Sequence, residues 1–539
     1  MVRPHRLWAR TLAATTLGAA LVACNGSSPN PAASPTPDAE STVPATVEPA
    51  EPIALADRAT FFGAGPEDHA SALATGDFNG DGAPDLLLGA FGDGPENQRP
   101  DAGETYVFFG PFAPGEQRDA AAGDHDVTIF GADSGDQAGR SLAAGDLNGD
   151  GVDDIVIGAL FADGPDESRE DAGAVAVVFG SAELPPAIDL ATGAPDVLLH
   201  GADAGDLAGY GLAIADLNGD GIDDLAASSF HADGPENDRV DAGEVAVVFG
   251  SDRLAPDIDL ADGAADVTIF GAEADDWLGE TLTSGDLNGD GAADLVAAAN
   301  FASGPDNARD AAGETYVVLG GESLPARLDL AADAPAMTVI GADPGDQIGH
   351  SLASADVNGD GFDDLLMGAV SADGPSNSRR LAGEAYVVLG GDPLPDTVDA
   401  AAGDAAFLAY APNEIDRLGR SLALGDLNSD GLADLLLGLP GADGPQEDRD
   451  AAGDLLVLLS DGRLRGEIDL AEFETDLAIT GDDPGDALTA EVFGLLPLLA
   501  LDMNGDGLDD VLVSAPNGDG PDNARTDAGE AYIIFAERP

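Results

Sequence analysis

The chain has 539 residues and carries 21 Lys and Arg against 102 Asp and Glu, which gives a formal net charge of −81 at pH 7. This excess of negative charge would repel a phosphate backbone, so it excludes nucleic acid as a partner. Hydrophobic residues make up 44% of the chain, which is too many for an acidic disordered polymer, and we therefore expect a folded protein.

The first 23 residues have the form of a secretion signal. Arg3, Arg6 and Arg10 precede an apolar stretch over residues 11–23 that is too short to span a bilayer comfortably. Residues 21–24 read Leu-Val-Ala-Cys and resemble the lipobox of bacterial lipoproteins, in which the signal is cleaved before a cysteine that is then lipidated. The resemblance implies a signal peptide over 1–23 and a lipid at Cys24. An ordinary signal peptide with an incidental cysteine is the alternative.

Residues 24–56 are rich in Pro, Ser, Thr and Ala and contain almost no large apolar side chains. Such a segment cannot bury a core, so we expect a disordered tether that begins at the lipidated cysteine. A lipid anchor would hold the remaining residues, 57–539, on a bacterial cell envelope and outside the cytoplasm, at the outer membrane, in the periplasm or at the cell surface.

Seven copies of one acidic motif, Asp-x-Asn-x-Asp-Gly, recur along residues 57–539. The spacing between successive copies is 69, then 70 four times, then 76 residues. A period sustained over this length indicates a repeat architecture. The first residue of each copy is Asp77, Asp146, Asp216, Asp286, Asp356, Asp426 or Asp502.

Each period predicts four short strands and almost no helix. In the second copy the strands are expected at 141–146, 153–161, 174–180 and 196–203, with Gly-rich turns between them. Four strands per repeat, repeated radially, is typical of a β-propeller, which leaves only short exposed edges. The fold class predicted from this pattern is all-β.

The repeated pattern, with FGAD, then GxSLAxGDLNGDGxDDL, then AGExYVVFG, resembles the FG-GAP repeat of integrin α-subunit heads and of many bacterial surface proteins. The resemblance implies a seven-bladed β-propeller of four-stranded blades that binds calcium at acidic loops on one face. It also implies that the N-terminal strand closes the ring. ATFFGA, residues 59–64, matches VTIFGA at 127–132 and is expected to complete the last blade.

Side-chain chemistry supports calcium at these loops. Asp146, Asn148 and Asp150 offer oxygens at positions one, three and five, Val152 offers its carbonyl at seven, and Asp154 stands at nine. Calcium accepts many hard oxygen ligands at flexible angles. An EF-hand is excluded because position twelve is Ile157 and the flanks are strands.

Up to seven structural Ca²⁺ ions are therefore expected, and the alternative is an acidic turn without metal. The predicted side-chain ligands are Asp77, Asn79, Asp81, Asp85, Asp146, Asn148, Asp150, Asp154, Asp216, Asn218, Asp220, Asp224, Asp286, Asn288, Asp290, Asp294, Asp356, Asn358, Asp360, Asp364, Asp426, Asn428, Asp430, Asp434, Asp502, Asn504, Asp506 and Asp510.

An arginine recurs in the connection between the second and third strands of every copy. Seven equivalent arginines favour a structural role, pairing with nearby carboxylates, over ligand binding. They are Arg99, Arg169, Arg239, Arg309, Arg379, Arg449 and Arg525.

One position differs between otherwise similar copies, at the start of the first strand. If the acidic loops lie on one face, this position lies on the opposite face, around the mouth of the central channel. Trp277, in a neighbouring connection, is a further candidate that could instead pack between blades. The candidate ligand-binding residues are Arg140, Tyr210, Trp277, Glu280, His350 and Arg420.

The predicted function is a lipid-anchored, calcium-binding adhesion or binding module, monomeric, for an extracellular or envelope protein or a glycan. We identify no set of catalytic residues in the sequence. The serine of GRSLA, which resembles a hydrolase nucleophile, is replaced by Gly in GYGLA and by Thr in GETLT, so it is a replaceable strand residue. The alternatives are a carbohydrate-binding lectin and an envelope hydrolase or lyase, because fold alone does not determine function.

Overall fold

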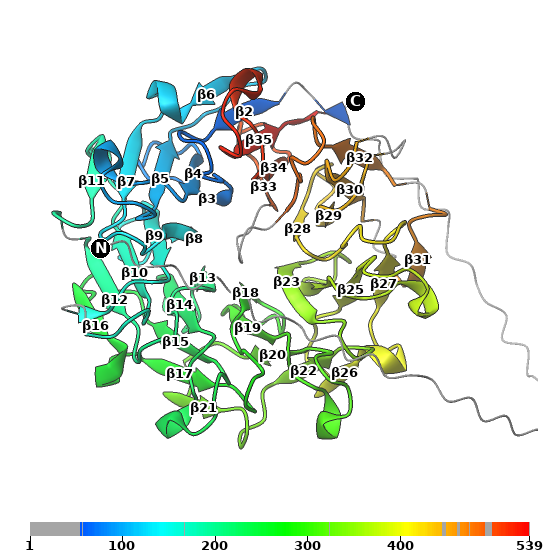
Figure 1. Cartoon of the computed structure of the whole chain (residues 1–539). Coiled ribbons are helices and arrows are strands. Elements are labelled where there is room, and N and C mark those ends of the chain that lie inside the picture. The colour runs from blue at the N-terminus through cyan, green and yellow to red at the C-terminus, as the bar shows by residue number, and fades with distance from the viewer. Residues whose placement is uncertain are drawn as a thin grey trace, which may run out of the picture. The chain divides into compact units, whose positions relative to one another are not determined.

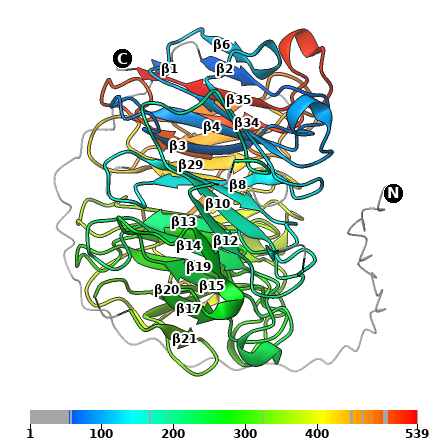
Figure 2. The same ribbon diagram turned by 90° about the vertical axis from the view of Figure 1, so that its left-hand side faces the viewer.

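The computed structural model describes residues 54–55 and 58–537, apart from 166–167, 194, 323, 445–448, 461–463, 474 and 491–497. The predicted signal, Cys24 and nearly all of the predicted tether lie outside the described residues. Seven sheets of the described chain are arranged in a ring, with the first strand of each at the centre and the first four strands of each antiparallel to one another (Figure 1). Figure 2 shows the ring from the side, where β12 and β17 of neighbouring blades lie one above the other.

The innermost strands come directly before the acidic motifs and are rich in small residues, which suit the crowded centre of a propeller. They are β3 (Ala72–Gly76), β8 (Ala138–Gly145), β13 (Leu212–Ala215), β18 (Thr281–Gly285), β23 (Ile348–Ala355), β28 (Leu422–Gly425) and β33 (Leu498–Leu501). We number blades 1 to 7 in this order.

The second strands follow the motifs and are buried along their whole length. Each blade packs between two neighbours, so both faces of these strands are covered and their sequences are nearly continuous apolar runs. They are β4 (Asp85–Ala90), β9 (Asp154–Ala159), β14 (Asp224–Ser229), β19 (Asp294–Ala299), β24 (Asp364–Ala369), β29 (Asp434–Leu439) and β34 (Asp510–Ala515).

The third and fourth strands continue each sheet outward. The third strands are β5 (Glu104–Phe108), β10 (Ala174–Val178), β15 (Glu244–Val248), β20 (Glu314–Val318), β25 (Glu384–Val388), β30 (Asp454–Leu458) and β35 (Glu530–Ile534). The fourth strands are β7 (Val127–Phe130), β12 (Val197–His200), β17 (Val267–Phe270), β22 (Met337–Ile340), β27 (Phe407–Tyr410), β32 (Leu477–Thr480) and, in blade 7, β2 (Ala59–Phe62).

The blades differ from the expectation of four strands. Six sheets gain a fifth, outermost strand that comes from the next copy and pairs in parallel with the fourth, as Asp189 does with Phe130. These strands are β6 (Gln117–Asp119), β11 (Ala187–Asp189), β16 (Asp257–Asp259), β21 (Arg327–Asp329), β26 (Thr397–Asp399) and β31 (Gly466–Asp469). The sheet of blade 6 has four strands among the described residues.

The N-terminal strand closes the ring, as predicted. β2 pairs antiparallel with β35, with Ala59 opposite Ile533 and Phe62 opposite Glu530. Phe61 is fully buried and meets the rings of Phe108 and Phe112 edge-on, at centroid distances of 5.0 and 5.3 Å. A short pair, β1 (Ala54–Leu55) with β36 (Ala536–Glu537), follows at the boundary of the predicted tether.

The core is divided among the blade interfaces. The described residues contain seven apolar clusters, each of which joins one blade to the next. The helical elements in the described part are single 3₁₀ turns, such as η1 (Pro95–Asn97) and η2 (Ala120–Ala122), and none of them is long or apolar enough to cross a membrane.

Candidate functional site

The two ends of each innermost strand carry different chemistry. In blade 2, Arg140 lies near the start of β8 and Asp146 comes directly after its end. At about 3.3 Å per residue, the five or six residues between them separate the two side chains by roughly 17–20 Å along the strand. The acidic loops therefore lie at one rim of the ring, and the differing residues lie at the other.

The acidic loops are tightly curled by their own backbone hydrogen bonds. In blade 2, Asp146 accepts hydrogen bonds from the N–H groups of Gly149, Asp150 and Gly151, at 2.8, 3.0 and 2.8 Å. Asp150 accepts one from Val152 N–H at 3.0 Å. Gly151 has φ of +87°, a left-handed conformation that glycine adopts without strain. These bonds hold positions one to seven in one compact turn.

The carboxyl group at position nine is fully buried below each loop. Asp154 accepts hydrogen bonds from Leu147 N–H at 3.1 Å, from Gly180 N–H at 3.0 Å and from the Asn148 side-chain amide at 3.1 Å. Burial, together with the charges of Asp146 and Asp150, raises the pKa of Asp154 to about 7. A bound cation would favour the charged form of such a group.

The donors at these loops match calcium in kind. They are carboxylate and amide oxygens with no nitrogen or sulfur ligand among them, the set that calcium prefers. In the part of the chain that the structure describes, the His, Cys, Asp and Glu side chains do not converge in groups of three around one point. The loop side chains are bonded to their own backbone, so they would have to turn inward to meet one ion.

The first aspartate of the Asp-Asp pair at the end of the motif has a role that was not predicted above. Asp153 accepts a hydrogen bond from Asp77 N–H at 2.7 Å, and its own N–H donates to the Asp77 carbonyl at 3.2 Å. Asp223, Asp363 and Asp509 make the same link to the preceding loop. The doubling in the sequence was the available signal. The first aspartate joins blades, and only the second belongs to its own loop.

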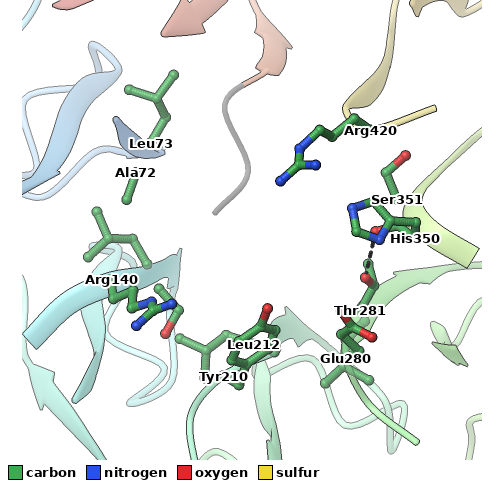
Figure 3. A pocket seen from close by; sticks show the side chains of 14 residues that line it. Ala72, Leu73, Arg140, Tyr210, Leu212, Glu280, Thr281, His350, Ser351 and Arg420 are labelled. Carbon is green, nitrogen blue, oxygen red and sulfur yellow. Dashed lines mark hydrogen bonds between the residues drawn. The ribbon is translucent and has the colours of Figure 1, made fainter. Parts of the chain in front are cut away.

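The opposite rim brings five of the six predicted ligand-binding residues to one pocket, which we call the channel mouth. It is lined by Arg140, Tyr210, Glu280, His350 and Arg420, one from each of five successive blades. In Figure 3 the guanidinium groups of Arg140 and Arg420 point into the opening from opposite sides. The mouth therefore combines two positive charges, one carboxylate and two rings.

Neighbouring side chains support the residues of the mouth. The guanidinium of Arg140 donates to the Gln137 side-chain oxygen at 2.8 Å and lies 5.9 and 5.7 Å from the ring centroids of Phe91 and Phe161. Thr281 donates its hydroxyl to the His350 carbonyl at 2.9 Å, which links blade 4 to blade 5. Arg140 and His350 lie within β8 and β23, whereas Tyr210, Glu280 and Arg420 lie in bends just before β13, β18 and β28.

Trp277 does not line the pocket. It is half-buried, and its ring lies 4.4 Å from Phe301, 5.0 Å from His231 and 5.7 Å from Phe230. The Phe230 ring is 4.4 Å from that of Tyr210, so an aromatic cluster extends from the mouth outward over blades 3 and 4.

Serine hydroxyls beside the mouth join blades. Ser141 donates to the Gly209 carbonyl, Ser351 to the Gly419 carbonyl at 2.8 Å and Ser421 to the Thr489 carbonyl at 2.9 Å. Each hydroxyl is used by the backbone of the following blade, which gives these serines a structural role.

The recurring arginines pair with carboxylates, as predicted, in six of seven copies. Arg309 donates two hydrogen bonds to Asp399, at 2.7 and 2.6 Å, and this contact lowers the pKa of Asp399. The partner is the last residue of the fifth strand. Arg449, in blade 6, donates to the Gly481 carbonyl at 2.7 Å, a hydrogen bond that Arg309 also makes, to Gly341, but it has no aspartate partner among the described residues. The pairs are Arg99–Asp189, Arg169–Asp259, Arg239–Asp329, Arg309–Asp399, Arg379–Asp469 and Arg525–Asp119.

Comparison with known proteins relates the repeats to a family. The FG-GAP repeat profile matches residues 69–108, 138–178, 278–318, 348–388, 418–458 and 494–534. Phosphatidylinositol-glycan-specific phospholipase D of Bos taurus is 28% identical over 396 residues, which cover 70% of this chain and 43% of that protein. Integrin alpha-PS2 of Drosophila melanogaster is 35% identical over 111 residues, or 20% of this chain and 8% of that one.

The chain thus spans less than half the length of these curated relatives. Among solved structures, a rhamnogalacturonan lyase of Bacillus licheniformis aligns over 86% of this chain and 71% of its own, with 13% identity and a TM-score of 0.38.

Proposed function

We propose that this chain, an FG-GAP repeat β-propeller, is a calcium-stabilised, lipid-anchored binding module of the cell envelope that holds a protein or glycan at its channel mouth. The observation that carries the proposal is the convergence of Arg140, Tyr210, Glu280, His350 and Arg420 on one pocket. These residues occupy a position at which the copies differ, directly after a glycine that repeats in the same five copies. A site that only held the ring together would have no need of four different kinds of side chain in five copies.

Calcium would be held at the opposite rim by the aspartates and asparagine at positions one, three, five and nine of each loop, with the carbonyl at seven. Bound calcium would supply positive charge where several carboxylates crowd together. The buried Asp154 and its equivalents support this proposal, because carboxyl groups in such surroundings resist ionisation unless a cation is near. Affinity in the extracellular range, about 10⁻⁴–10⁻³ M, would suffice.

The envelope location rests on the N-terminal sequence. We propose that Cys24 carries the lipid and that residues 24–56 hold the propeller away from the membrane. Replacing Cys24 by Ser should release the protein from the membrane fraction, as measured by fractionation and by mass spectrometry of the N-terminal peptide.

A lectin is the second candidate, and the aromatic cluster favours it. Tyr210 and Trp277 are both half-buried and are joined through Phe230, so ring faces lie beside the mouth. Sugars stack on such faces through their C–H groups. A catalytic role would need further residues, and the similarity to phospholipase D covers less than half of that protein.

The test compares two variants of the full chain on a glycan array and in pull-downs from envelope extracts, each with and without calcium. In the first variant the five mouth residues are changed to Ser. In the second, five exposed acidic residues outside the loops, Glu183, Asp252, Asp262, Glu322 and Asp392, are changed to Ser. The proposal expects the first variant to lose the ligand and the second to keep it. Equal binding by both variants would place the ligand elsewhere.

A further inference from the structure

Arginines are rare in this acidic chain, and most of those described have a carboxylate within 4.0 Å. Arg380 and Arg417 do not form such a pair with any residue that the structure describes. Arg417 is half-buried and Arg380 is exposed. Arg449 and Arg465 also have no carboxylate within 4.0 Å among the described residues, but Arg380 and Arg417 differ from them in that the charge of one acts on the other.

The backbone brings these two arginines to one edge of the channel mouth. Arg380 belongs to the connection between β24 and β25 of blade 5, and its carbonyl accepts a hydrogen bond from Ile415 N–H at 3.0 Å. Arg417 N–H donates to the neighbouring Leu381 carbonyl at 3.3 Å. Arg420 N–H donates to the Arg417 carbonyl at 3.2 Å, and Arg420 lines the mouth. Three guanidinium groups therefore come from adjoining backbone.

Arg417 lies among like charges. Burial, and then the charges of Arg420 and Arg380, lower the pKa of Arg417. The carboxyl group next in sequence, Asp416, is 3% exposed and accepts a hydrogen bond from Asn413 N–H at 2.8 Å. Burial raises the pKa of Asp416 to about 6, with the carboxylates Asp454 and Asp443 contributing in the same direction. Asp416 is therefore turned to its own loop.

We propose that Arg380, Arg417 and Arg420 form a binding site for a single oxyanion group, a carboxylate, sulfate or phosphate, carried by a ligand at the blade 5 and blade 6 edge of the channel mouth. This names the chemistry of the ligand and so rests on the proposed function. Guanidinium groups suit the task because their planar N–H donors match the paired oxygens of these anions.

The rest of the molecule restricts what carries that group. A protein with a net charge of −81 repels polyanions at long range, so a densely charged polymer or an anionic membrane is disfavoured. A ligand with one acidic group in otherwise neutral surroundings avoids most of this repulsion. An acidic sugar within a mostly neutral glycan has this form, and it could use the aromatic cluster as well.

Equivalent blades supply substitutions that the fold already accepts. Gln137 and Gln347 occupy the place of Arg417 in blades 2 and 5, with φ of 54° and 59° against 60° for Arg417. Thr526 occupies the place of Arg380 in blade 7, since its carbonyl accepts the equivalent hydrogen bond, from Glu67 N–H at 2.9 Å. Arg417→Gln and Arg380→Thr are therefore conservative for the backbone.

The experiment titrates the full chain, with calcium and with chloride as the background anion at constant ionic strength, by isothermal calorimetry. The three probes are inorganic sulfate, methyl phosphate and methyl β-glucuronide, so that the arms distinguish the possible oxyanions. At least one probe should bind, and the Arg380→Thr/Arg417→Gln double variant should weaken it tenfold or more. The control Arg253→Gln, whose side chain is 87% exposed, should leave the affinity unchanged.

A second measurement tests whether the charge of Arg417 lacks a carboxylate partner. In chloride alone, Arg417→Gln should keep or raise the melting temperature, because it removes repulsion and no ion pair. A lower melting temperature would show that Arg417 has a structural carboxylate partner and would overturn the site. Absence of binding by all three probes would also overturn the oxyanion site. If glycan or protein binding at the mouth survived that result, the proposed function would stand without the oxyanion site.

Discussion

The two rims of the ring differ in how far the seven copies agree. At the rim of the acidic loops, Asp146 and its six equivalents repeat the same residue. At the channel mouth, the position just before or at the start of the innermost strand differs between five copies, which hold Arg140, Tyr210, Glu280, His350 and Arg420. The repeated rim keeps the blades in one register, and the differing rim presents a surface without sevenfold symmetry. Within this chain, agreement between repeats accompanies architecture, and we propose that disagreement marks recognition.

Opening the ring tests the architectural half of this comparison most severely. Deleting residues 57–64 removes β2, the fourth strand of blade 7, and leaves the edge of β35 without its partner. The buried Phe61 is also lost from the interface with blade 1. We expect no cooperative thermal transition by calorimetry. Deleting eight residues from the predicted tether, 40–47, is the matched control, and an unchanged transition in the first variant would contradict closure by β2.

Removing calcium should have the next largest effect. A ligand at a hundred times its Kd stabilises the folded state by about 2.7 kcal/mol per site, so seven sites would together shift the melting temperature by on the order of 10–20 °C. Excess EGTA should therefore lower the transition measured by circular dichroism. Restoration by calcium but not by magnesium would identify the ion. A transition that EGTA does not move would exclude structural calcium.

The seven recurring arginines allow a comparison between copies, because Arg449 alone among them has no aspartate partner among the described residues. Arg309→Gln removes two charge-assisted hydrogen bonds to Asp399, and we expect a loss of about 1–2 kcal/mol at pH 7. Arg449→Gln is the matched control, since Arg449 makes the same kind of carbonyl hydrogen bond as Arg309 but no aspartate pair among the described residues, and its loss should be smaller. Urea unfolding of both variants measures the difference.

The Arg309–Asp399 pair should also make the stability of the protein depend on pH. Arg309 lowers the pKa of Asp399 in the folded state below its ordinary value near 3.8. The pair therefore stabilises the fold above that value, and the contribution disappears as pH falls through the lowered pKa. The stability gap between wild type and Arg309→Gln should shrink below about pH 4. A gap that is constant from pH 7 to pH 3 would show that the ion pair is not its source.

The smallest effect on stability is expected at the channel mouth. Changing the five mouth residues to Ser should move the melting temperature by only a degree or two, because the other blades show that this position tolerates different side chains. Changing Ser141, Ser351 and Ser421 to Ala should cost more, roughly 1 kcal/mol for each hydroxyl, because each bonds to the next blade. The reverse order would mean that the mouth is structural.

Much of the architecture could be predicted from the period and the alternation of residues. The seven copies, the strands beside each acidic motif and the closing strand β2 are all confirmed, although the strands are slightly shifted. In blade 2 the first strand covers Ala138–Gly145, against an expected 141–146. The fifth strands could not be predicted, because three residues such as Ala187–Asp189 have no local signal and form a strand only against β7.

For the candidate site, the sequence by itself determined which residues are unlike their equivalents, because a 70-residue period makes the copies directly comparable. The tertiary structure decided which of them meet. It gathered five at one mouth, moved Trp277 into an aromatic cluster, and placed Arg380 beside Arg417 from different blades. The physical reason is that periodicity orders residues along a strand, whereas contacts across blades depend on how the strands curve into a ring.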